Sequence, residues 1–510
     1  MRTGTGMIGL ALVAAMSLPG GVLTAAPAAA AGCTAGQATD FDGDGTRDVA
    51  IADPEATVSG REEAGAVHIV YGGGKGAATI SQDTAGIPGA AEKGDRYGHT
   101  LATFDHNRDG CTDLVVGIPY EDLEDETDAG LVQILYGAPG GLATGTAVRE
   151  YLQGSGSGNI GSTAAEAGDW FGHALAAGAT SSGEPYLVIG VPGEDVGTVA
   201  DAGMAHYLRG STNTGFTQNT AGVSGDAEEN DRFGYAVAAS PHHVAVGNPG
   251  EAIGEHAFSG GLQILTHTIN SGGIPTPVAG VHQDAPGING VAEAGDRLAA
   301  ALAAVPYRPS GASSANETLL AVGIPGEDLT TGEDAGRVIT LRVTAAGDVT
   351  QMADIHQSFA DVAGVGDTGD YFGQHLTAVN TAPGSVGTAQ TVLLAVGVPG
   401  EDIEAEAARD AGGVQIFPMV GEPGSADVWL EKGQFGLPGT PGPQEYLGTG
   451  LSADRERLHI GVPYGPASDR GVYSVPWTSL LSGQAGAVGA VRPGQGGVPA
   501  DGRAFGAVVE

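Results

Sequence analysis

The sequence predicts an all-β fold, a seven-bladed β-propeller with four-stranded blades, and three observations support this prediction. A short apolar run that ends at Pro recurs seven times, as in Leu394-Ala-Val-Gly-Val-Pro-Gly-Glu-Asp402. A Gly-Asp-x-aromatic-Gly segment recurs between these runs, at intervals of roughly 62 to 75 residues. Helical periodicity is absent outside the N-terminal segment. Four short strands in a repeat of this length are typical of a propeller blade, and seven blades can close a ring.

The Gly-Asp-x-aromatic-Gly segment is expected to lead into the first strand of each unit. Its well-preserved copies are Gly94-Asp-Arg-Tyr-Gly98, Gly168-Asp-Trp-Phe-Gly172, Asn230-Asp-Arg-Phe-Gly234 and Gly369-Asp-Tyr-Phe-Gly373. Two further copies are degraded, and they read Gly295-Asp-Arg-Leu-Ala299 and Gln444-Glu-Tyr-Leu-Gly448.

The Pro-ended run is expected to be the second strand, buried and followed by a turn. Its copies begin at Val49, Leu114, Leu187, Val244, Leu320, Leu394 and Leu458. A third strand follows a small-residue turn, as in Ala129-Gly-Leu-Val-Gln-Ile-Leu-Tyr136, where Gln133 alternates with apolar neighbours as on a sheet with two different faces. A fourth strand contains Gln, as in Ile80-Ser-Gln-Asp83, and a Gly-rich connector follows it.

The repeats are expected to form one domain, because units that share a stacked core fold together. This domain spans residues 32–510. Its approximate units are residues 32–94, 95–168, 169–230, 231–295, 296–369, 370–444 and 445–503, with a closing strand at 504–510.

Residues 1–31 have the pattern of a secretory signal peptide. Arg2 precedes an apolar stretch from Met7 to Leu18, and Ala28-Ala-Ala-Ala31 offers a small-residue cleavage site. The apolar stretch is too short to span a membrane. We therefore expect a soluble, secreted protein that is cleaved near Ala31. We also expect it to be a monomer.

The charge balance excludes two classes of partner. The chain has 60 acidic and 21 basic residues, for a net charge of -39. Such a surface repels nucleic acid and anionic lipid, and it favours solubility and divalent cations.

Two cysteines are present, Cys33 and Cys111. In an exported protein a pair of cysteines predicts one disulfide. The alternatives are two free thiols, or a lipid anchor on Cys33, which follows the signal segment. The residues before Cys33 lack the Leu usual at a lipidation site, so the disulfide is preferred.

Two acidic loops have the oxygen-ligand spacing of a calcium site, Asp40-Phe-Asp-Gly-Asp-Gly-Thr-Arg-Asp48 and Asp105-His-Asn-Arg-Asp-Gly-Cys-Thr-Asp113. Oxygen side chains at positions 1, 3, 5 and 9 can converge on one cation, Gly at position 6 permits the reversal, and position 7 supplies a backbone carbonyl. Hard oxygen ligands in a flexible loop favour Ca²⁺ over Mg²⁺. The expected ligands are Asp40, Asp42, Asp44, Thr46 and Asp48, then Asp105, Asn107, Asp109, Cys111 and Asp113. The alternative is an acidic turn that binds no metal.

The aromatic-Gly segment and the Gly-x-Pro strand end resemble the two halves of the FG-GAP repeat. That repeat builds the seven-bladed propeller of integrin alpha subunits and of many bacterial secreted proteins. The resemblance covers nearly all of the chain after residue 31. It implies that the two acidic loops correspond to the calcium loops of the family, and it suggests adhesion as the function.

A second acidic pattern follows the proline in four units, where Glu-Asp is followed by Asp-Ala-Gly. The copies are Glu121 and Asp122 with Asp128, Glu194 and Asp195 with Asp201, Glu327 and Asp328 with Asp334, and Glu401 and Asp402 with Asp410. Because the pattern repeats, we expect a structural role such as capping turn amides. A further cation site at each copy is the alternative.

The function expected from the sequence is recognition of an extracellular protein or glycan. No G-x-S-x-G, H-E-x-x-H or P-loop motif occurs, and no unique catalytic constellation stands out. Histidines recur at equivalent positions, such as His99 with His173, which we interpret as packing or surface residues because a catalytic group is normally needed once. The alternative is a secreted propeller-fold hydrolase or lyase that acts on polysaccharide or phospholipid, since fold alone does not decide function.

The C-terminus is expected to complete the first unit. Residues 32–33 stand where unit two has Tyr97-Gly98, so the first unit lacks an aromatic-Gly strand. Phe505-Gly506 near the C-terminus supplies one. We predict that Phe505 to Val509 pair with the strand that starts at Val49. The competing interpretation is a truncated eighth unit, with residues 34–39 as the missing strand.

Overall fold

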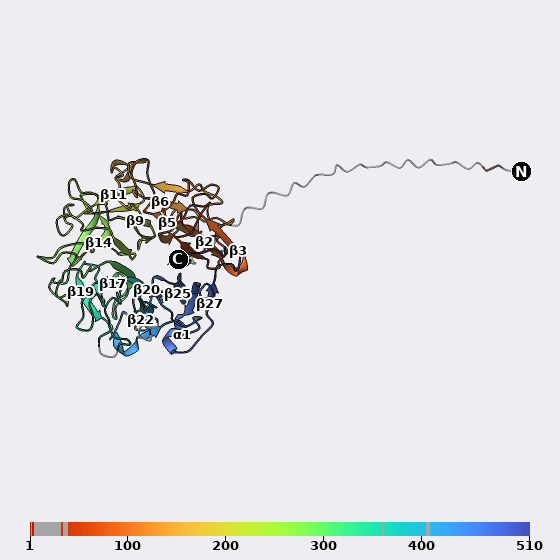
Figure 1. Ribbon diagram of the computed structural model, residues 1–510. Helices are drawn as coiled ribbons and strands as arrows, with labels where there is room; N and C mark the ends of the chain where they lie inside the picture. Colours follow the sequence, from red (N-terminus) through yellow and green to blue (C-terminus); the bar gives the residue numbers. More distant parts are fainter. Residues whose placement is uncertain (2, 5–31, 34–38, 360–361, 404–407) are drawn as a thin grey trace. The chain divides into compact units, whose positions relative to one another are not determined.

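The computed structural model describes residues 1, 3–4, 32–33, 39–359, 362–403 and 408–510. The chain divides into two units, Met1–Ala31 and Gly32–Glu510. The second unit is a ring of seven four-stranded antiparallel sheets, which confirms the predicted all-β propeller (Figure 1). Most of the expected signal segment lies outside the described residues, so its role stays a prediction.

Each blade runs from a strand beside the ring axis to a strand at the outer edge. In that order the first four sheets are β28 (Val508–Val509), β1 (Val49–Asp53), β2 (Ala66–Tyr71), β3 (Gly76–Ile80); β4 (Thr100–Phe104), β5 (Asp113–Ile118), β6 (Leu131–Leu135), β7 (Arg149–Tyr151); β8 (Ala174–Ala179), β9 (Pro185–Val191), β10 (Met204–Arg209), β11 (Thr212–Phe216); and β12 (Ala236–Ala239), β13 (His243–Asn248), β14 (Gly261–Ile269), β15 (Pro275–Val281). The other three are β16 (Ala301–Tyr307), β17 (Glu317–Ile324), β18 (Arg337–Val343), β19 (Val349–Ile355); β20 (His375–Asn380), β21 (Val392–Val398), β22 (Gly413–Pro418), β23 (Val428–Leu430); and β24 (Gly450–Ala453), β25 (Arg457–Val462), β26 (Gly471–Pro476), β27 (Gly489–Val491).

Helical structure is confined to short connecting segments in the part of the chain that the structure describes. These are α1 (Trp477–Ser482) and the 3₁₀ turns η1 (Gly72–Gly74), η2 (Ile160–Ser162) and η4 (Gly424–Ala426). None of the described helices is long and apolar enough to cross a bilayer.

The C-terminal strand closes the ring, as predicted. Val509 pairs with Ile51 and Val508 with Ala52, so β28 is the first strand of blade one. The strand is shorter than predicted, because Phe505 to Ala507 form the turn before it. The Phe505 side chain is nevertheless fully buried. Residues 34–38, which the competing interpretation would have used, lie outside the described residues.

The aromatic residue of each well-preserved Gly-Asp-x-aromatic-Gly segment is buried between two blades, and so is Phe505 of the C-terminal Phe505-Gly506 pair. Tyr97, Phe171, Phe233, Phe372 and Phe505 are each 0% exposed. The Gly that follows is required because a side chain there would collide with residues of the preceding blade. At Gly98 the φ angle is 88°, and a Cβ atom would lie 2.8 Å from Val67 Cγ2. The repeat therefore encodes the stacking of one blade on the next.

A Gln–Glu hydrogen bond links five successive pairs of blades. Gln82 Nε2 donates to Glu121 Oε2 of the next blade at 2.6 Å. The equivalent pairs are Gln153–Glu194, Gln218–Glu251, Gln283–Glu327 and Gln357–Glu401. At the next interface Lys432 replaces the glutamine, and its buried ammonium group contacts Glu445 at 2.8 Å and Asp469 at 2.9 Å.

The Asp that follows this Glu caps a turn. Asp122 Oδ1 accepts the backbone N–H of Asp128 at 2.9 Å. The other three copies make the same bond, from Asp201 to Asp195, Asp334 to Asp328 and Asp410 to Asp402. Both members of the Glu-Asp pattern therefore have structural partners, as expected.

Candidate functional site

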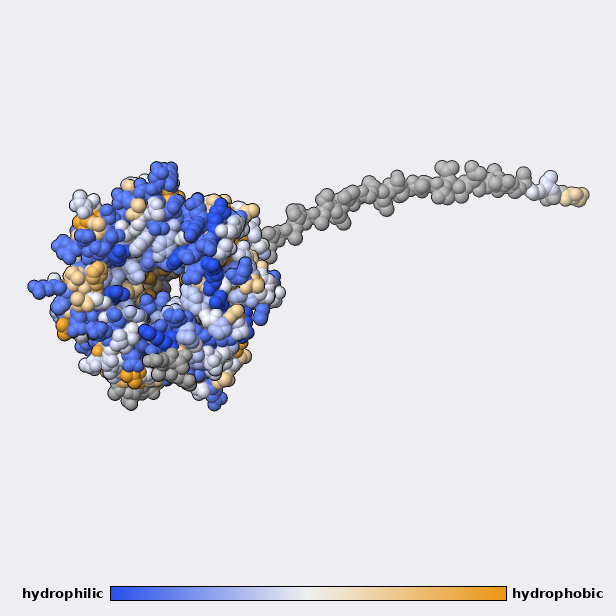
Figure 2. Space-filling model, in the orientation of Figure 1, coloured by the Kyte–Doolittle hydropathy of each residue, from blue (hydrophilic) through white to orange (hydrophobic). Residues whose placement is uncertain are grey.

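The ring is open at its axis, and the first strands of the blades line this opening. The space-filling view shows the gap and a largely hydrophilic surface around it (Figure 2). The cavity there has a volume of about 940 Å³. The residues that line the cavity come from the end of the ring where the first strand of each blade begins and the second strand ends. Thr100, at the start of β4, and Pro54, just after β1, are examples. We call this end of the cavity the channel mouth.

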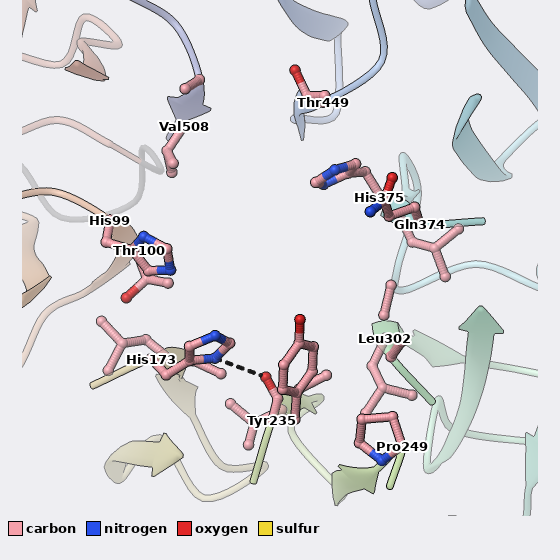
Figure 3. Close-up of a pocket in the computed structure, with 18 of the residues that line it drawn as sticks. His99, Thr100, His173, Tyr235, Pro249, Leu302, Gln374, His375, Thr449 and Val508 are labelled. Atoms are coloured by element: carbon pink, nitrogen blue, oxygen red, sulfur yellow. Dashed lines mark hydrogen bonds between the residues drawn. The ribbon is translucent and has the colours of Figure 1, made fainter. Parts of the chain in front are cut away.

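Equivalent positions of the repeat meet at the channel mouth. The residue after the aromatic-Gly pair stands at the start of each first strand. His99, His173, Tyr235, Gln374 and Thr449 occupy this position and surround the cavity (Figure 3). The repeat fixes the backbone here and leaves the side chain free to differ between blades.

The x residue of Gly-Asp-x-aromatic-Gly forms an outer ring. It has left-handed backbone in six blades, as Arg96, Trp170, Arg232, Arg297, Tyr371 and Tyr446. Three of these side chains are cationic and three are aromatic. Arg96, Arg232 and Arg297 line the cavity.

Aromatic rings gather on the side of the mouth formed by blades two to four. The His99 and His173 ring centroids are 5.4 Å apart, and the His173 and Tyr235 centroids are 4.7 Å apart. Trp170 stacks on His173 with 6.0 Å between centroids, and Tyr120 meets His99 edge-on at 5.2 Å. We call these five residues the aromatic cluster.

Two arginines lie over this cluster. The Arg96 guanidinium carbon is 5.5 Å from the Tyr120 ring centroid, and that of Arg232 is 5.0 Å from Trp170. Arg96 also contacts Glu63 at 2.7 Å. These cation–π contacts hold positive charge at the mouth of a strongly acidic protein.

The histidines of the mouth are neutral at pH 7. Burial in the channel wall lowers the pKa of His99 to about 3 and those of His173 and His375 to about 4. His173 Nδ1 lies 3.2 Å from the Tyr235 carbonyl oxygen, as the dashed line in Figure 3 marks. Neutral imidazoles can both donate and accept hydrogen bonds, which suits contact with hydroxyl groups.

Basic and uncharged side chains make up most of the lining of the mouth. Among the described residues that line the cavity, Glu55 is the only carboxylate, and its Oε1 accepts a hydrogen bond from Tyr464 at 3.0 Å. A pair of carboxylates for acid–base catalysis is therefore not assembled in this part of the structure. Guanidinium groups, aromatic faces and neutral imidazoles are instead the groups that hold a polar ligand.

His99 and His173, interpreted from the sequence as packing or surface residues, do pack against neighbouring rings, and they also line the cavity. They belong to different blades, yet their rings contact each other inside the channel. In a ring, equivalent positions on the first strands converge at the axis. Their recurrence in the sequence was therefore the signal that could have identified them.

The first predicted calcium loop brings three carboxylates together. Ligand oxygens of Asp40, Asp42 and Asp48 all lie within 4.8 Å of one another, and these residues are 0%, 8% and 1% exposed. Burial raises the pKa of Asp48 to about 6. Such a buried acidic group fits a hard divalent cation. Lys75 Nζ also contacts this loop, at 2.5 Å from Asp42 and 2.7 Å from Asp44.

The second predicted loop has the same backbone arrangement. Asp105 accepts the N–H groups of Asp109 and Gly110, both at 3.1 Å, as Asp40 does from Asp44 and Gly45 in the first loop. Asp109 Oδ1 accepts the N–H of Cys111 at 2.9 Å.

Cys33 and Cys111 form the predicted disulfide, with their Cα atoms 5.0 Å apart. Cys111 lies in the second calcium loop, so this bond joins that loop to the segment before the first one.

The predicted calcium loops and the channel mouth lie at opposite ends of the strands. In blade two the mouth residues precede β4, and the loop at 105–113 follows it. A five-residue strand spans roughly 17 Å. Calcium at these loops would therefore not touch a ligand at the mouth.

Comparison with known proteins matches part of the chain to a family model and to curated relatives. Residues 40–116 match an FG-GAP-like repeat model. Phosphatidylinositol-glycan-specific phospholipase D of Bos taurus is 30% identical over 178 residues, which is 34% of this chain and 20% of that protein. The Mus musculus protein of the same name is 35% identical over 104 residues, which is 20% of this chain and 12% of that protein. The chain thus spans a fifth or less of these two relatives.

A solved structure also matches the ring. The periplasmic gluconolactonase PpgL of Pseudomonas aeruginosa aligns over 89% of this chain and 97% of its own, with 11% identity and a TM-score of 0.42.

Proposed function

We propose that the chain, a seven-bladed propeller of FG-GAP repeats, is a secreted recognition module that binds a protein or glycan ligand at the channel mouth. The observation that carries this proposal is that four rings of the aromatic cluster and three arginines line one cavity. The four rings are those of Tyr120, His99, His173 and Tyr235. Elsewhere the blades are built from near-identical parts. At the mouth, by contrast, the side chain after the aromatic-Gly pair varies between blades, as His99, Tyr235, Gln374 and Thr449 show.

The size and chemistry of the cavity suit a ligand group that inserts partly into the ring. A volume of about 940 Å³ is within the range of small-molecule and saccharide sites. The Tyr120 ring lines the cavity, and the neutral imidazoles offer hydrogen bonds to hydroxyl groups. The curated relatives carry the name of a phosphatidylinositol glycan, a ligand that combines sugar with phosphate.

We also propose that both acidic loops bind Ca²⁺ and support the fold from the opposite face. The two loops are not equivalent. Lys75 is paired with two expected ligands of the first loop. In the part of the chain that the structure describes, the second loop makes no ion pair with a lysine. We therefore expect the second loop to bind calcium more tightly, with dissociation constants in the range of about 10⁻⁴–10⁻³ M that is typical of extracellular sites.

A glycan and protein binding screen tests the recognition function. Wild-type protein is compared with Tyr120→Ala, which removes an aromatic ring that lines the cavity. The control is Phe359→Ala, because Phe359 is 43% exposed and does not line the cavity. We expect a ligand that binds the wild type and the control and is lost in Tyr120→Ala. Ligands that bind all three proteins equally would place recognition away from the mouth.

A hydrolase that acts on polysaccharide or phospholipid is the second candidate, favoured by the name of the curated relatives. A turnover assay over glycoside, polysaccharide and phospholipid substrates separates the two candidates. The recognition proposal requires no turnover. Reproducible turnover that a single substitution at the mouth abolishes would establish the hydrolase.

A further inference from the structure

An acidic residue stands beside the outer ring of the mouth in most blades. It precedes the Ala-Gly turn and has left-handed backbone, as Glu63, Asp128, Asp201, Asp334 and Asp410. Its carbonyl oxygen accepts the N–H of the x residue in the next blade, for example from Arg96 to Glu63 at 3.0 Å and from Arg232 to Asp201 at 3.1 Å. Each x residue is thus held next to a carboxylate of the preceding blade.

Blade four departs from this rule. Phe258 replaces the acid there, with the same left-handed backbone (φ 58°) and the same hydrogen bond from Arg297 N–H at 2.9 Å. The Phe258 side chain is 45% exposed and lines the cavity. An exposed Phe on a strained backbone position has no evident role in packing, because the other blades place Asp or Glu there.

The replacement leaves Arg297 without a charge partner. Arg96 is paired with Glu63 at 2.7 Å, and Arg232 lies 4.0 Å from Asp201. Arg297 makes no ion pair and no side-chain hydrogen bond within the described residues, and it is exposed at the cavity. Its guanidinium group therefore keeps all of its donors for a ligand.

A guanidinium group with free donors is best suited to an anionic ligand group. It binds carboxylate or phosphate through two parallel hydrogen bonds, which are stronger than neutral ones. Phe258 beside it offers an apolar face to a ring. The protein carries a net charge of -39, so a long polyanion would be repelled, whereas a short ligand with one or two anionic groups meets mainly the local arginines.

We propose that the channel mouth recognises an anionic saccharide, with the carboxylate or phosphate group on Arg297 and a sugar ring against Phe258. This inference rests on the proposed recognition function and names its ligand class. The aromatic cluster then faces the remainder of the saccharide across the cavity.

Isothermal titration calorimetry with defined oligosaccharides tests this inference. The probes are a glucuronic acid oligosaccharide, a 6-phosphorylated mannose oligosaccharide, and the neutral counterpart of each. We expect an anionic probe to bind at least about 10-fold more tightly than its neutral counterpart, because a hydrogen bond to a charged group contributes at least that factor. The two anionic probes distinguish carboxylate from phosphate.

Two variants assign the anion to its position. Arg297→Gln removes the charge, and Phe258→Asp restores the acid that the other blades carry at a backbone position that accepts it. Both should weaken the anionic probe by about 10- to 100-fold. Arg297→Gln should leave the neutral probe unchanged, whereas Phe258→Asp should weaken the neutral probe as well, because it removes the face that packs against the sugar ring. Arg455→Gln is the matched control, because Arg455 is exposed in the loop between β24 and β25 at the opposite face.

The outcomes separate this inference from the function on which it rests. Equal affinity for anionic and neutral probes, with loss of both in Tyr120→Ala, would refute the anion site and keep the recognition function. Tight anionic binding that Arg297→Gln does not change would also overturn the anion site. Failure of all four probes, together with a blank binding screen, would refute both proposals.

Discussion

Loss of the Phe505 side chain, which anchors the closing strand, should destabilise the whole ring. Phe505 is fully buried between blades seven and one, and its ring lies 5.3 Å from that of His68. A buried Phe→Ala substitution costs about 3–5 kcal/mol. Unfolding entropy is about 2.1 cal/mol/K per residue, so the 479 residues of the propeller (510 − 31) give about 1 kcal/mol/K. Phe505→Ala should therefore lower the melting temperature by about 3–5 °C if the ring unfolds as one unit.

Deletion of residues 504–510 should have a larger effect. It also removes the ladder with β1 and the N–H of Ala504, which donates to the buried carboxylate of Asp53 at 2.9 Å. Scanning calorimetry on both variants measures the losses, with Phe359→Ala as the exposed control, expected within about 1 °C of wild type. An unchanged melting curve after the deletion would refute ring closure by this strand.

Three further predictions concern the calcium loops, the pH dependence and the disulfide. Calorimetry should find two calcium sites, and replacing Asp44 and Asp109 with Ala should remove both; unchanged stoichiometry would put calcium elsewhere. The melting temperature should fall as pH rises from about 6.5 to 8, because burial raises the pKa of Glu121 to about 8 and the folded state holds that proton more tightly than the unfolded state. Below about pH 6.5, buried histidines such as His173, whose pKa is lowered to about 4, make stability rise with pH instead, so the prediction is confined to pH 6.5–8. A melting temperature that rises between pH 6.5 and 8 would contradict the raised pKa of Glu121. Cys33→Ser should cost about 2–5 kcal/mol in denaturant unfolding, and wild-type stability in that variant would show that the disulfide contributes nothing.

The fold could be predicted because the repeat carries it. The buried aromatic and the close-approach Gly, as in Tyr97-Gly98, occur in five units, and the Pro-ended run occurs in all seven, so seven blades were predicted. The ring closure could also be predicted from the sequence, because Phe505-Gly506 matches the segment that the first unit lacks. The limits of the closing strand could not be predicted, since Phe505 to Ala507 form a turn and only two residues pair with β1.

The repeat indicated which positions recur, but the arrangement of side chains at the channel mouth could not be predicted from it. Its residues are far apart in the sequence, and only the ring brings His99, His173 and Tyr235 together. The departure at Phe258 was visible as a missing acid before Ser259-Gly260. Its consequence for Arg297 depends on a hydrogen bond between blades, which the sequence alone does not reveal.

Hydrogen–deuterium exchange with a ligand from the binding screen tests the central claim most directly, because it maps where the ligand binds. We expect protection at residues 96–101, 170–175 and 232–237, which form the aromatic side of the mouth, and no change at the calcium loops 40–48 and 105–113. Protection confined to the calcium loops or to the outer strands β3, β7 and β11 would contradict recognition at the channel mouth.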